Sequence, residues 1–340
     1  MSLQPLKQVA STLYTAAVQW RNRRFDRGVG ISQIDRPVIS VGNLSMGGTG
    51  KTPMVRWIVE HLSTMGVVPA VVTRGYGARP GQEADEVLEY RDALPNMPIF
   101  IGGDRVGVLR RDLPSHPEVD CIVMDDGFQH RRLHRDLDLV LVSAHESLES
   151  CAVLPAGRLR EPPGNLQRAD AIIVTGSRVI DGALAARIES LNGLPPVAWC
   201  GHAWSSLTLI EAESVRDVDI DWLHRKRVVV RLGIGSPETV RSQLRVLGAT
   251  IAGERPVRDH QPFGQAEAAF LTEVLDADAI LMTAKDWVKA RDVIDLRQLQ
   301  VPIVIPQLEL RFLEGEAALG QLIHDAVVDH ENMDLSDTVE

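Results

Sequence analysis

The feature that most constrains the fold is a glycine-rich stretch between a short apolar run and a helical pattern. Residues 38–41 are apolar and β-branched, which predicts a buried strand. A glycine loop at 45–50 follows, and Lys51-Thr52-Pro53 opens a segment with helical spacing. A strand, a glycine loop and a helix start are together typical of a phosphate-binding loop, in which backbone N–H groups turn towards phosphate oxygens.

We expect this loop to hold the phosphates of a nucleotide. Lys51 supplies a point charge to them, and the Thr52 hydroxyl is a ligand for Mg²⁺. Ser45 stands where the motif G-x-x-x-x-G-K-[ST] has its first glycine, so the loop is a variant. The alternative is a glycine-rich turn with a chance Gly-Lys-Thr. The predicted nucleotide-binding residues are Ser45, Met46, Gly47, Gly48, Thr49, Gly50, Lys51 and Thr52.

The second strong motif is an apolar strand at 121–124 that ends in two aspartates, Asp125 and Asp126. A strand ending in Asp is the usual partner of a phosphate loop, and its carboxylate reaches Mg²⁺ directly or through water. Adjacent side chains of an extended chain point to opposite sides. We therefore expect Asp125 to serve the metal and Asp126 to have a separate role. An Asp-Gly turn that closes a strand is the alternative.

Strand and helix patterns alternate along most of the chain, which predicts an α/β fold with a mostly parallel sheet and helices on both faces. The ligand then lies at the carboxyl ends of the strands. Expected strands are 38–41, 67–72, 99–101, 121–124, 137–142, 171–174 and 227–232, and expected helices are 53–64, 105–112, 183–191 and 237–247.

The first residues form an amphipathic pattern at 3–27. Its apolar positions are Leu6, Val9, Ala10, Leu13, Ala17 and Trp20, and it ends in the basic cluster Arg21, Arg23, Arg24 and Arg27. The segment is too polar to span a bilayer, which takes about 20 mostly apolar residues. Two interpretations stay open: a helix in a membrane interface, with its arginines on anionic headgroups, or a helix packed on its own domain.

Composition excludes some function classes. The net charge of −10 over 340 residues argues against broad nucleic-acid binding, which needs a basic surface. Cys121, Cys151 and Cys200 lie far apart without CxxC spacing, which indicates a reducing compartment and no structural zinc. We see no signal peptide and no internal repeat.

Taken together, the motifs resemble the tetraacyldisaccharide 4′-kinase family of lipid A biosynthesis, over about residues 6–325. The resemblance depends on the segments 41–53 (VGNLSMGGTGKTP), 73–77 (TRGYG), 125–130 (DDGFQH), 154–162 (LPAGRLREP) and 259–260 (DH). The second and third segments are unusual, so their joint presence is specific.

The resemblance implies a function. The γ-phosphate of ATP, with Mg²⁺, would pass to the 4′-hydroxyl of a tetraacyldisaccharide 1-phosphate, giving lipid IVA. Two α/β/α sandwich domains with mostly parallel sheets, the first P-loop NTPase-like, would face each other across a cleft. The implied location is the cytoplasmic face of the inner membrane, on its anionic surface, with no nucleic acid and no obligate protein partner. We expect a helix at 1–30, a P-loop domain at 31–145, a second domain at 146–325 and an acidic tail at 326–340.

The same resemblance assigns chemistry to weaker signals. By itself, an acidic pair such as Asp85-Glu86 is usually just solvated, and a lone histidine beside an aspartate is usually structural. The family pattern makes Asp85 the base, with His260 and Asp126 as the other catalytic residues; Asp104 is the alternative base, because Ala84 replaces a family glycine. The expected substrate or positioning residues are Arg74, Glu86, Arg105, Gln129, His130, Arg158, Arg160 and Glu161.

Two other classes share the loop. Partition-type or septum-placement ATPases need a lysine where Met46 stands. Soluble ligases of the dethiobiotin synthetase type need no basic amphipathic leader. A nucleotide-binding module without catalysis is the remaining alternative.

Overall fold

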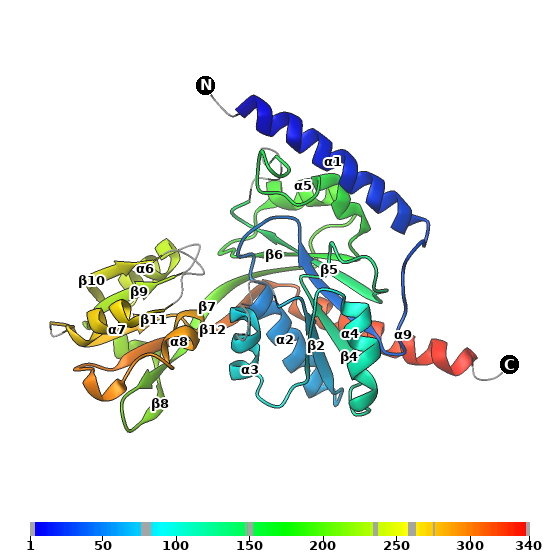
Figure 1. The fold of residues 1–340 in the computed structure, drawn as a ribbon. Coiled ribbons are helices and arrows are strands. Elements are labelled where there is room, and N and C mark those ends of the chain that lie inside the picture. Colours follow the sequence, from blue (N-terminus) through cyan, green and yellow to red (C-terminus); the bar gives the residue numbers. More distant parts are fainter. Residues whose placement is uncertain are drawn as a thin grey trace. The chain divides into compact units, whose positions relative to one another are not determined.

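The computed structural model describes residues 4–75, 83–146, 148, 152–233, 237–257, 263–274 and 276–337, and the chain divides into two compact units (Figure 1). The first unit comprises Met1–Gly75, Ala93–His202 and Leu310–Glu340; the second comprises Tyr76–Asp92 and Ala203–Glu309. Each unit is thus assembled from separate stretches of chain. The contiguous domain ranges expected from the sequence stay a prediction.

The first unit is built on a parallel sheet in the strand order β6-β5-β1-β4-β2-β3. Its strands are β1 (Val38–Asn43), β2 (Pro69–Thr73), β3 (Ile99–Ile101), β4 (Cys121–Asp125), β5 (Leu137–Ser143) and β6 (Ala171–Thr175). Its helices are α1 (Gln4–Asp26), α2 (Lys51–Thr64), α4 (Arg105–Asp112), α5 (Gly182–Asn192) and α9 (Glu316–Asp337). The start of β7 (Ala198–Ile210) pairs with β6.

Helices cover both faces of this sheet, as Figure 1 shows. Side chains alternate along each strand, so Val38 and Ile39 serve opposite faces. The face with Val38 packs against Val106 and Leu109 of α4 and Ile188 of α5. Helices α2 and α9 pack on each other, α2 against β1 and β4 and α9 against β5. The predicted α/β fold with a mostly parallel sheet is confirmed.

The second unit also has a parallel sheet, in the order β10-β9-β11-β12. Its strands are β8 (Val215–Val218), β9 (Arg227–Leu232), β10 (Thr250–Pro256), β11 (Ala279–Met282) and most of β12 (Ile303–Glu314), and β8 pairs antiparallel with β7. Its helices are α3 (Asp85–Ala93), α6 (Pro237–Val246), α7 (Gln265–Thr272) and α8 (Ala284–Ala290). Helix α6 packs on one face of the sheet, and α7 and α8 pack on the other.

The end of the chain differs from the expected acidic tail. Residues 326–337 continue α9, and Val327 and His330 are buried. Leu319, Ile323 and Val327 are spaced by four residues and form one buried stripe. The chain is therefore helical up to residue 337, and the bounds of the acidic tail expected at 326–340 stay a prediction.

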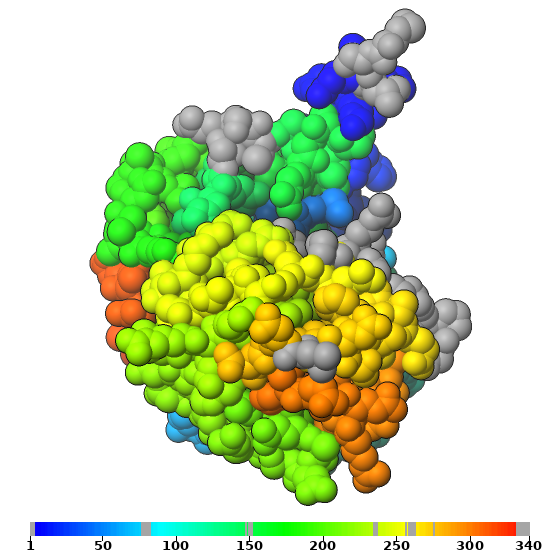
Figure 2. Space-filling view, turned by 90° about the vertical axis from the view of Figure 1, so that its left-hand side faces the viewer, coloured from blue at the N-terminus to red at the C-terminus, as the bar shows by residue number. Residues whose placement is uncertain are grey.

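Helix α1 has the reverse of the usual orientation for an amphipathic helix on a domain. Its apolar residues face away from the protein: Leu6 and Leu13 are each 69% exposed and Trp20 is 71% exposed. Ser11, Val18 and Asn22 form the buried face. Figure 2 shows the blue start of α1 standing out from the green surface of the same unit. Helix α1 therefore packs on its own unit, as one of the two interpretations has it, but not through its apolar stripe. The other interpretation, a helix in a membrane interface, stays a prediction.

Gly42 in β1 is a sharp test of this architecture. A Cβ there would lie 2.4 Å from the Phe128 Cβ and 2.5 Å from the Phe128 backbone nitrogen. Gly42→Ala must therefore push the 125–130 turn away from β1. We expect it to lower the free energy of unfolding, measured with urea, by about 1–3 kcal/mol.

Gly182, the first residue of α5, is the matched control. An added Cβ meets no atom within 4 Å there, so Gly182→Ala should change stability by less than about 0.5 kcal/mol. Equal effects of the two substitutions would contradict the close packing of Gly42.

Candidate active site

The glycine loop joins the end of β1 to the start of α2, as the sequence predicts. Gly50 precedes α2 with φ of 80°, a left-handed conformation that favours glycine. The loop is held from inside: the Asn43 amide donates to Thr49 Oγ1 at 2.8 Å, and Thr175 Oγ1 donates to the Thr49 carbonyl at 2.8 Å. The loop is thus fixed by its neighbours as well as by its own glycines.

Parallel pairing of β1 and β4 brings the two strong motifs together. In this register Val41 lies beside Asp125, so both strands end at the same edge of the sheet. Lys51, the first residue of α2, has its Nζ 3.4 Å from Asp126 Oδ1 and 3.4 Å from Asn43 Oδ1. The predicted meeting of the phosphate loop with the aspartate strand is seen in these contacts.

Asp126 is the centre of a charged cluster. It has a φ of 52°, uncommon for a residue other than glycine, and this turns its carboxylate out of line with β4. Arg160 Nη1 donates to both Asp126 oxygens at 2.7 Å and to Gln129 Oε1 at 3.2 Å. The Gln129 amide donates in turn to the Asn43 carbonyl at 2.9 Å. Lys51 and Arg160 are thereby gathered around one carboxylate.

The cluster keeps Asp126 ionised. Burial by itself raises the pKa of the Asp126 carboxyl, but the nearby charges of Lys51 and Arg160 outweigh burial and hold the pKa below its usual range. The stabilisation is present at neutral pH and is lost only as the pH falls through this lowered pKa. A carboxylate that stays charged can hold two cations in place.

The arginine segment 158–160 is bound directly to the phosphate loop. The Met46 backbone N–H donates to the Arg158 carbonyl at 2.7 Å, and the Arg160 N–H donates to the Leu44 carbonyl at 2.6 Å. The Arg158 guanidinium donates to the Met46 carbonyl, at 2.9 Å from Nη2. Both predicted arginines therefore lie at the loop.

Asp125 and Thr52 are suitable for a nucleotide-bound Mg²⁺. Asp125 is the last residue of β4 and is 2% exposed, and Thr52 lies in the first turn of α2. The described residues include no group of three or more His, Cys, Asp or Glu side chains that could hold a metal. Mg²⁺ needs no such group, because it binds through one or two protein oxygens, phosphates and water.

Two predicted positioning residues, His130 and Glu161, have surroundings that do not suit contact with a substrate phosphate. His130 is half-buried near Arg105; burial, together with the Arg105 and Arg135 charges, lowers the pKa of His130 to about 4. The imidazole is then neutral at pH 7 and brings no charge to a phosphate. Glu161 is fully buried and accepts hydrogen bonds from Asn22, Asn165 and Arg168. It has no exposed surface on which a substrate could bind.

The predicted base lies in the second unit. Asp85 and Glu86 open α3, and the Lys289 Nζ lies 2.7 Å from Asp85 Oδ2, with the Lys289 side chain only 10% exposed. A second ion pair, from Arg291 Nη1 to Asp92 at 2.7 Å, also joins α3 to the residues that end α8. His260 lies outside the described residues.

The remaining predicted residues lie at strand ends of the first unit. Arg74 follows β2 and is exposed, and Arg105 opens α4 and is buried. Asp104, the alternative base, precedes α4, and its carboxylate lies 3.4 Å from an Arg132 nitrogen. Both partners of this pair are more than half exposed.

Sequence reasoning missed several residues that support the site. Asn43 is the last residue of the strand before the loop, a position that could have marked it. Thr175, whose hydroxyl holds the loop, is the last residue of β6. The His202 ring packs closely on Gly50: a Cβ added to this glycine would lie 2.7 Å from His202 Nε2. No local spacing links Lys289 to Asp85, because the two residues lie far apart in the chain.

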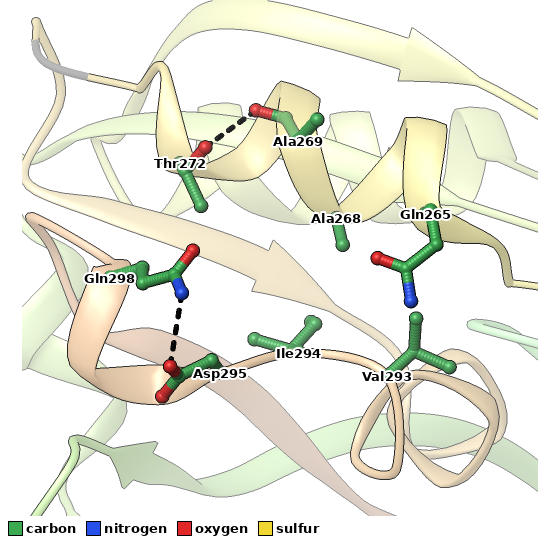
Figure 3. A pocket seen from close by; sticks show the side chains of 8 residues that line it. All are labelled: Gln265, Ala268, Ala269, Thr272, Val293, Ile294, Asp295 and Gln298. Atoms are coloured by element: carbon green, nitrogen blue, oxygen red, sulfur yellow. Dashed lines mark hydrogen bonds between the residues drawn. The ribbon is translucent and has the colours of Figure 1, made fainter.

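A separate surface hollow of about 250 Å³ lies in the second unit between α7 and residues 293–298 (Figure 3). Small and polar side chains line it, including Ala268, Thr272 and Gln298. Among the described residues that line it, none is a predicted site residue, and the only charged side chain is that of Asp295, which accepts a hydrogen bond from Gln298. It is not the candidate site.

Comparison with known proteins identifies the family. A family model described as tetraacyldisaccharide-1-P 4′-kinase matches residues 3–328. This chain belongs to the tetraacyldisaccharide-1-P 4′-kinase family. Membership confirms the resemblance seen in the sequence and the prediction of a kinase that phosphorylates an alcohol group. The ATPase-switch and ligase alternatives are thereby set aside.

Individual relatives agree with this assignment. A tetraacyldisaccharide 4′-kinase from Geobacter sulfurreducens is 34% identical over 339 residues, 93% of this chain and 92% of that protein. One from Pseudomonas fluorescens is 35% identical over 297 residues, 82% of this chain and 81% of that protein. The crystal structure of LpxK from Aquifex aeolicus in complex with ATP has a TM-score of 0.73 and 25% identity, and covers 96% of this chain and 100% of that one.

The half-buried His130 predicts a pH effect on stability. The unfolded chain takes up a proton at His130 near the ordinary pKa of 6.5, whereas the folded chain does so only near pH 4. The unfolded state therefore binds more protons between these values, and His130 lowers stability as the pH falls through this window. Between pH 7 and pH 5, we expect the free energy of unfolding to fall less in His130→Gln than in the wild type, by up to about 2 kcal/mol.

Urea unfolding of both proteins at the two pH values measures the difference. The comparison cancels Asp138, whose pKa is raised to about 6 by burial and which acts in the opposite direction. Equal pH dependence in the two proteins would contradict a buried neutral His130.

Proposed function

We propose that this chain transfers the γ-phosphate of ATP to the 4′-hydroxyl of a tetraacyldisaccharide 1-phosphate, giving lipid IVA. The observation that carries the proposal is the cluster of Lys51, Asp126 and Arg160 beside a glycine loop, in a chain that matches this kinase family over residues 3–328. Phosphoryl transfer needs positioning and positive charge far more than covalent chemistry. A cluster that brings two cations to a phosphate loop is suited to that task.

The nucleotide would bind along the loop from Ser45 to Thr52. Its phosphates would accept hydrogen bonds from backbone N–H groups at the start of α2, where the helix dipole favours negative charge. Lys51 and Arg160 would neutralise the transferred group, with Asp126 and Gln129 holding Arg160 in place. The relative from Aquifex aeolicus that binds ATP supports this role for the loop.

Thr52 and Asp125 would hold the Mg²⁺ ion. When bound there, the ion would reduce the charge repulsion that opposes attack by the sugar oxygen. The buried carboxylate of Asp125 and the hydroxyl of Thr52 are both oxygen ligands, which Mg²⁺ prefers.

Asp85 would remove the proton from the 4′-hydroxyl as the new P–O bond forms, with His260 assisting. Lys289 supports this role because it holds the Asp85 carboxylate at 2.7 Å and so fixes its direction. Arg74, Glu86, Arg105 and Arg158 stay candidates for positioning the substrate. Glu161 and His130 are better suited to supporting the site than to contacting the lipid.

Helix α1 would lie on the anionic cytoplasmic face of the inner membrane. Its exposed apolar stripe of Leu6, Val9, Leu13 and Trp20 has no partner within the described residues, and Arg23 and Arg24 lie in its last turn. An apolar stripe with nearby arginines is the pattern of a helix in a membrane interface. No helix in the described part of the chain is long and apolar enough to cross a bilayer.

The function is tested by incubating the purified protein with ATP, Mg²⁺ and a tetraacyldisaccharide 1-phosphate, and analysing the lipid by mass spectrometry. We expect a phosphorylated product and a fall in kcat of about 10²–10³-fold for Lys51→Met, because one preorganised donor to the developing charge is lost. ATP turnover without phosphorylated lipid would contradict the proposal.

The role of Asp85 is tested separately. Asp85→Ala should lower kcat by at least about tenfold, with ATP affinity within about twofold of the wild type, because base assistance acts on the acceptor hydroxyl. Asp92→Ala is the matched control: it removes the ion pair of α3 with Arg291 and should leave kcat nearly unchanged. If Asp85→Ala retains wild-type kcat, Asp85 is not the base, and Asp104 is the next residue to substitute.

A further inference from the structure

The buried face of α1 carries two polar side chains, and both are hydrogen-bonded to the 153–161 segment. Arg131 also holds the helix, donating to the Asn22 carbonyl at 3.1 Å and to Asp26 Oδ1 at 2.7 Å. Ser11 Oγ donates to the Val153 carbonyl at 2.7 Å, and the Asn22 amide donates to Glu161 Oε2 at 2.9 Å. Arg21 Nη2 lies 3.6 Å from Glu161 Oε1. Ser11 and Asn22 are 5% and 6% exposed, so these are buried contacts along most of the helix.

Glu161 is the main anchor of that segment. Its carboxylate is fully buried and also accepts from Asn165 at 2.6 Å and from Arg168 at 2.8 Å. Burial alone raises the pKa of the Glu161 carboxyl, but the Arg168 charge and these hydrogen bonds hold the pKa below its usual range. The ionised carboxylate therefore depends on its donors, and α1 supplies one of them through Asn22.

The opposite edge of the same segment holds the phosphate loop. Arg160 precedes Glu161 and donates through its backbone to Leu44 and through its side chain to Asp126. Consecutive side chains of an extended chain point to opposite sides. Arg160 thus reaches the charged cluster, and Glu161 reaches α1.

We infer that Asn22, with Ser11, is a positioning residue for phosphoryl transfer: α1 holds the 153–161 segment so that Arg160 stays at the nucleotide phosphates. The two faces of α1 then have separate tasks. The exposed apolar face binds the membrane, and the buried polar face supports the active site. This inference rests on the proposed function, in which Arg160 contacts the nucleotide.

The test separates the two faces with two variants. Asn22→Leu removes the hydrogen bond to Glu161 and keeps the number and branching of the side-chain heavy atoms. Leu13→Ser with Trp20→Ser alters only the exposed stripe. For each protein, the dissociation constant for ATP with Mg²⁺ is measured by calorimetry without lipid, and binding to phosphatidylglycerol vesicles is measured by sedimentation.

We expect Asn22→Leu to weaken ATP binding about tenfold and to keep vesicle binding, since a buried carboxylate loses one donor. The exposed-face variant should bind ATP as the wild type does and lose vesicle binding. In an Arg160→Ala background, Asn22→Leu should cause no further loss of ATP affinity, because it acts through that arginine. Ser11→Ala is a milder variant, used if Asn22→Leu does not fold.

Wild-type ATP affinity in Asn22→Leu, or equal losses in the presence and absence of Arg160, would overturn the inference. Its failure is distinguishable from failure of the proposed function. If the wild type does not bind ATP or phosphorylate the lipid, the proposed function is wrong. If the wild type does both, and Asn22→Leu binds ATP as tightly as the wild type, the inference alone is wrong.

Discussion

The candidate active site depends on one ionised carboxylate. The Asp126 carboxylate lies within 3.4 Å of the Lys51 ammonium, at the start of α2, and within 2.7 Å of the Arg160 guanidinium, from a distant segment of the chain. Two cations repel each other unless an anion lies between them. The low pKa of Asp126 follows from these neighbours, so the cation pair and the charge that holds it stabilise each other.

A second buried carboxylate extends this arrangement outward. Glu161 adjoins Arg160 in sequence and faces the other way, towards Asn22 and Arg168. The Arg168 guanidinium lies 3.7 Å from the centre of the Phe128 ring, in the turn that carries Asp126. The phosphate loop, the aspartate turn, the arginine segment and α1 are therefore parts of one hydrogen-bonded structure within the first unit.

Many elements were predictable from local pattern. The expected strand at 99–101 and the expected helix at 105–112 have the observed bounds, and β1 and β4 differ from expectation only at their ends. These segments have strong apolar periodicity and are bounded by glycine, proline or aspartate, which is why pattern alone finds them. The last helix was missed because the acidic residues from Asp325 onwards dominate the pattern of the sequence, whereas its apolar stripe of Leu319, Ile323 and Val327 is short.

The sequence by itself determined the phosphate loop, the aspartate strand and the family, because these depend on residue types at short, fixed spacings. Only the tertiary structure decided which face of α1 is buried, that Glu161 is an internal anchor, and that Lys289 is the partner of Asp85. Each of these contacts joins residues far apart in the chain. Their geometry comes from strand order and helix packing, which no local spacing encodes.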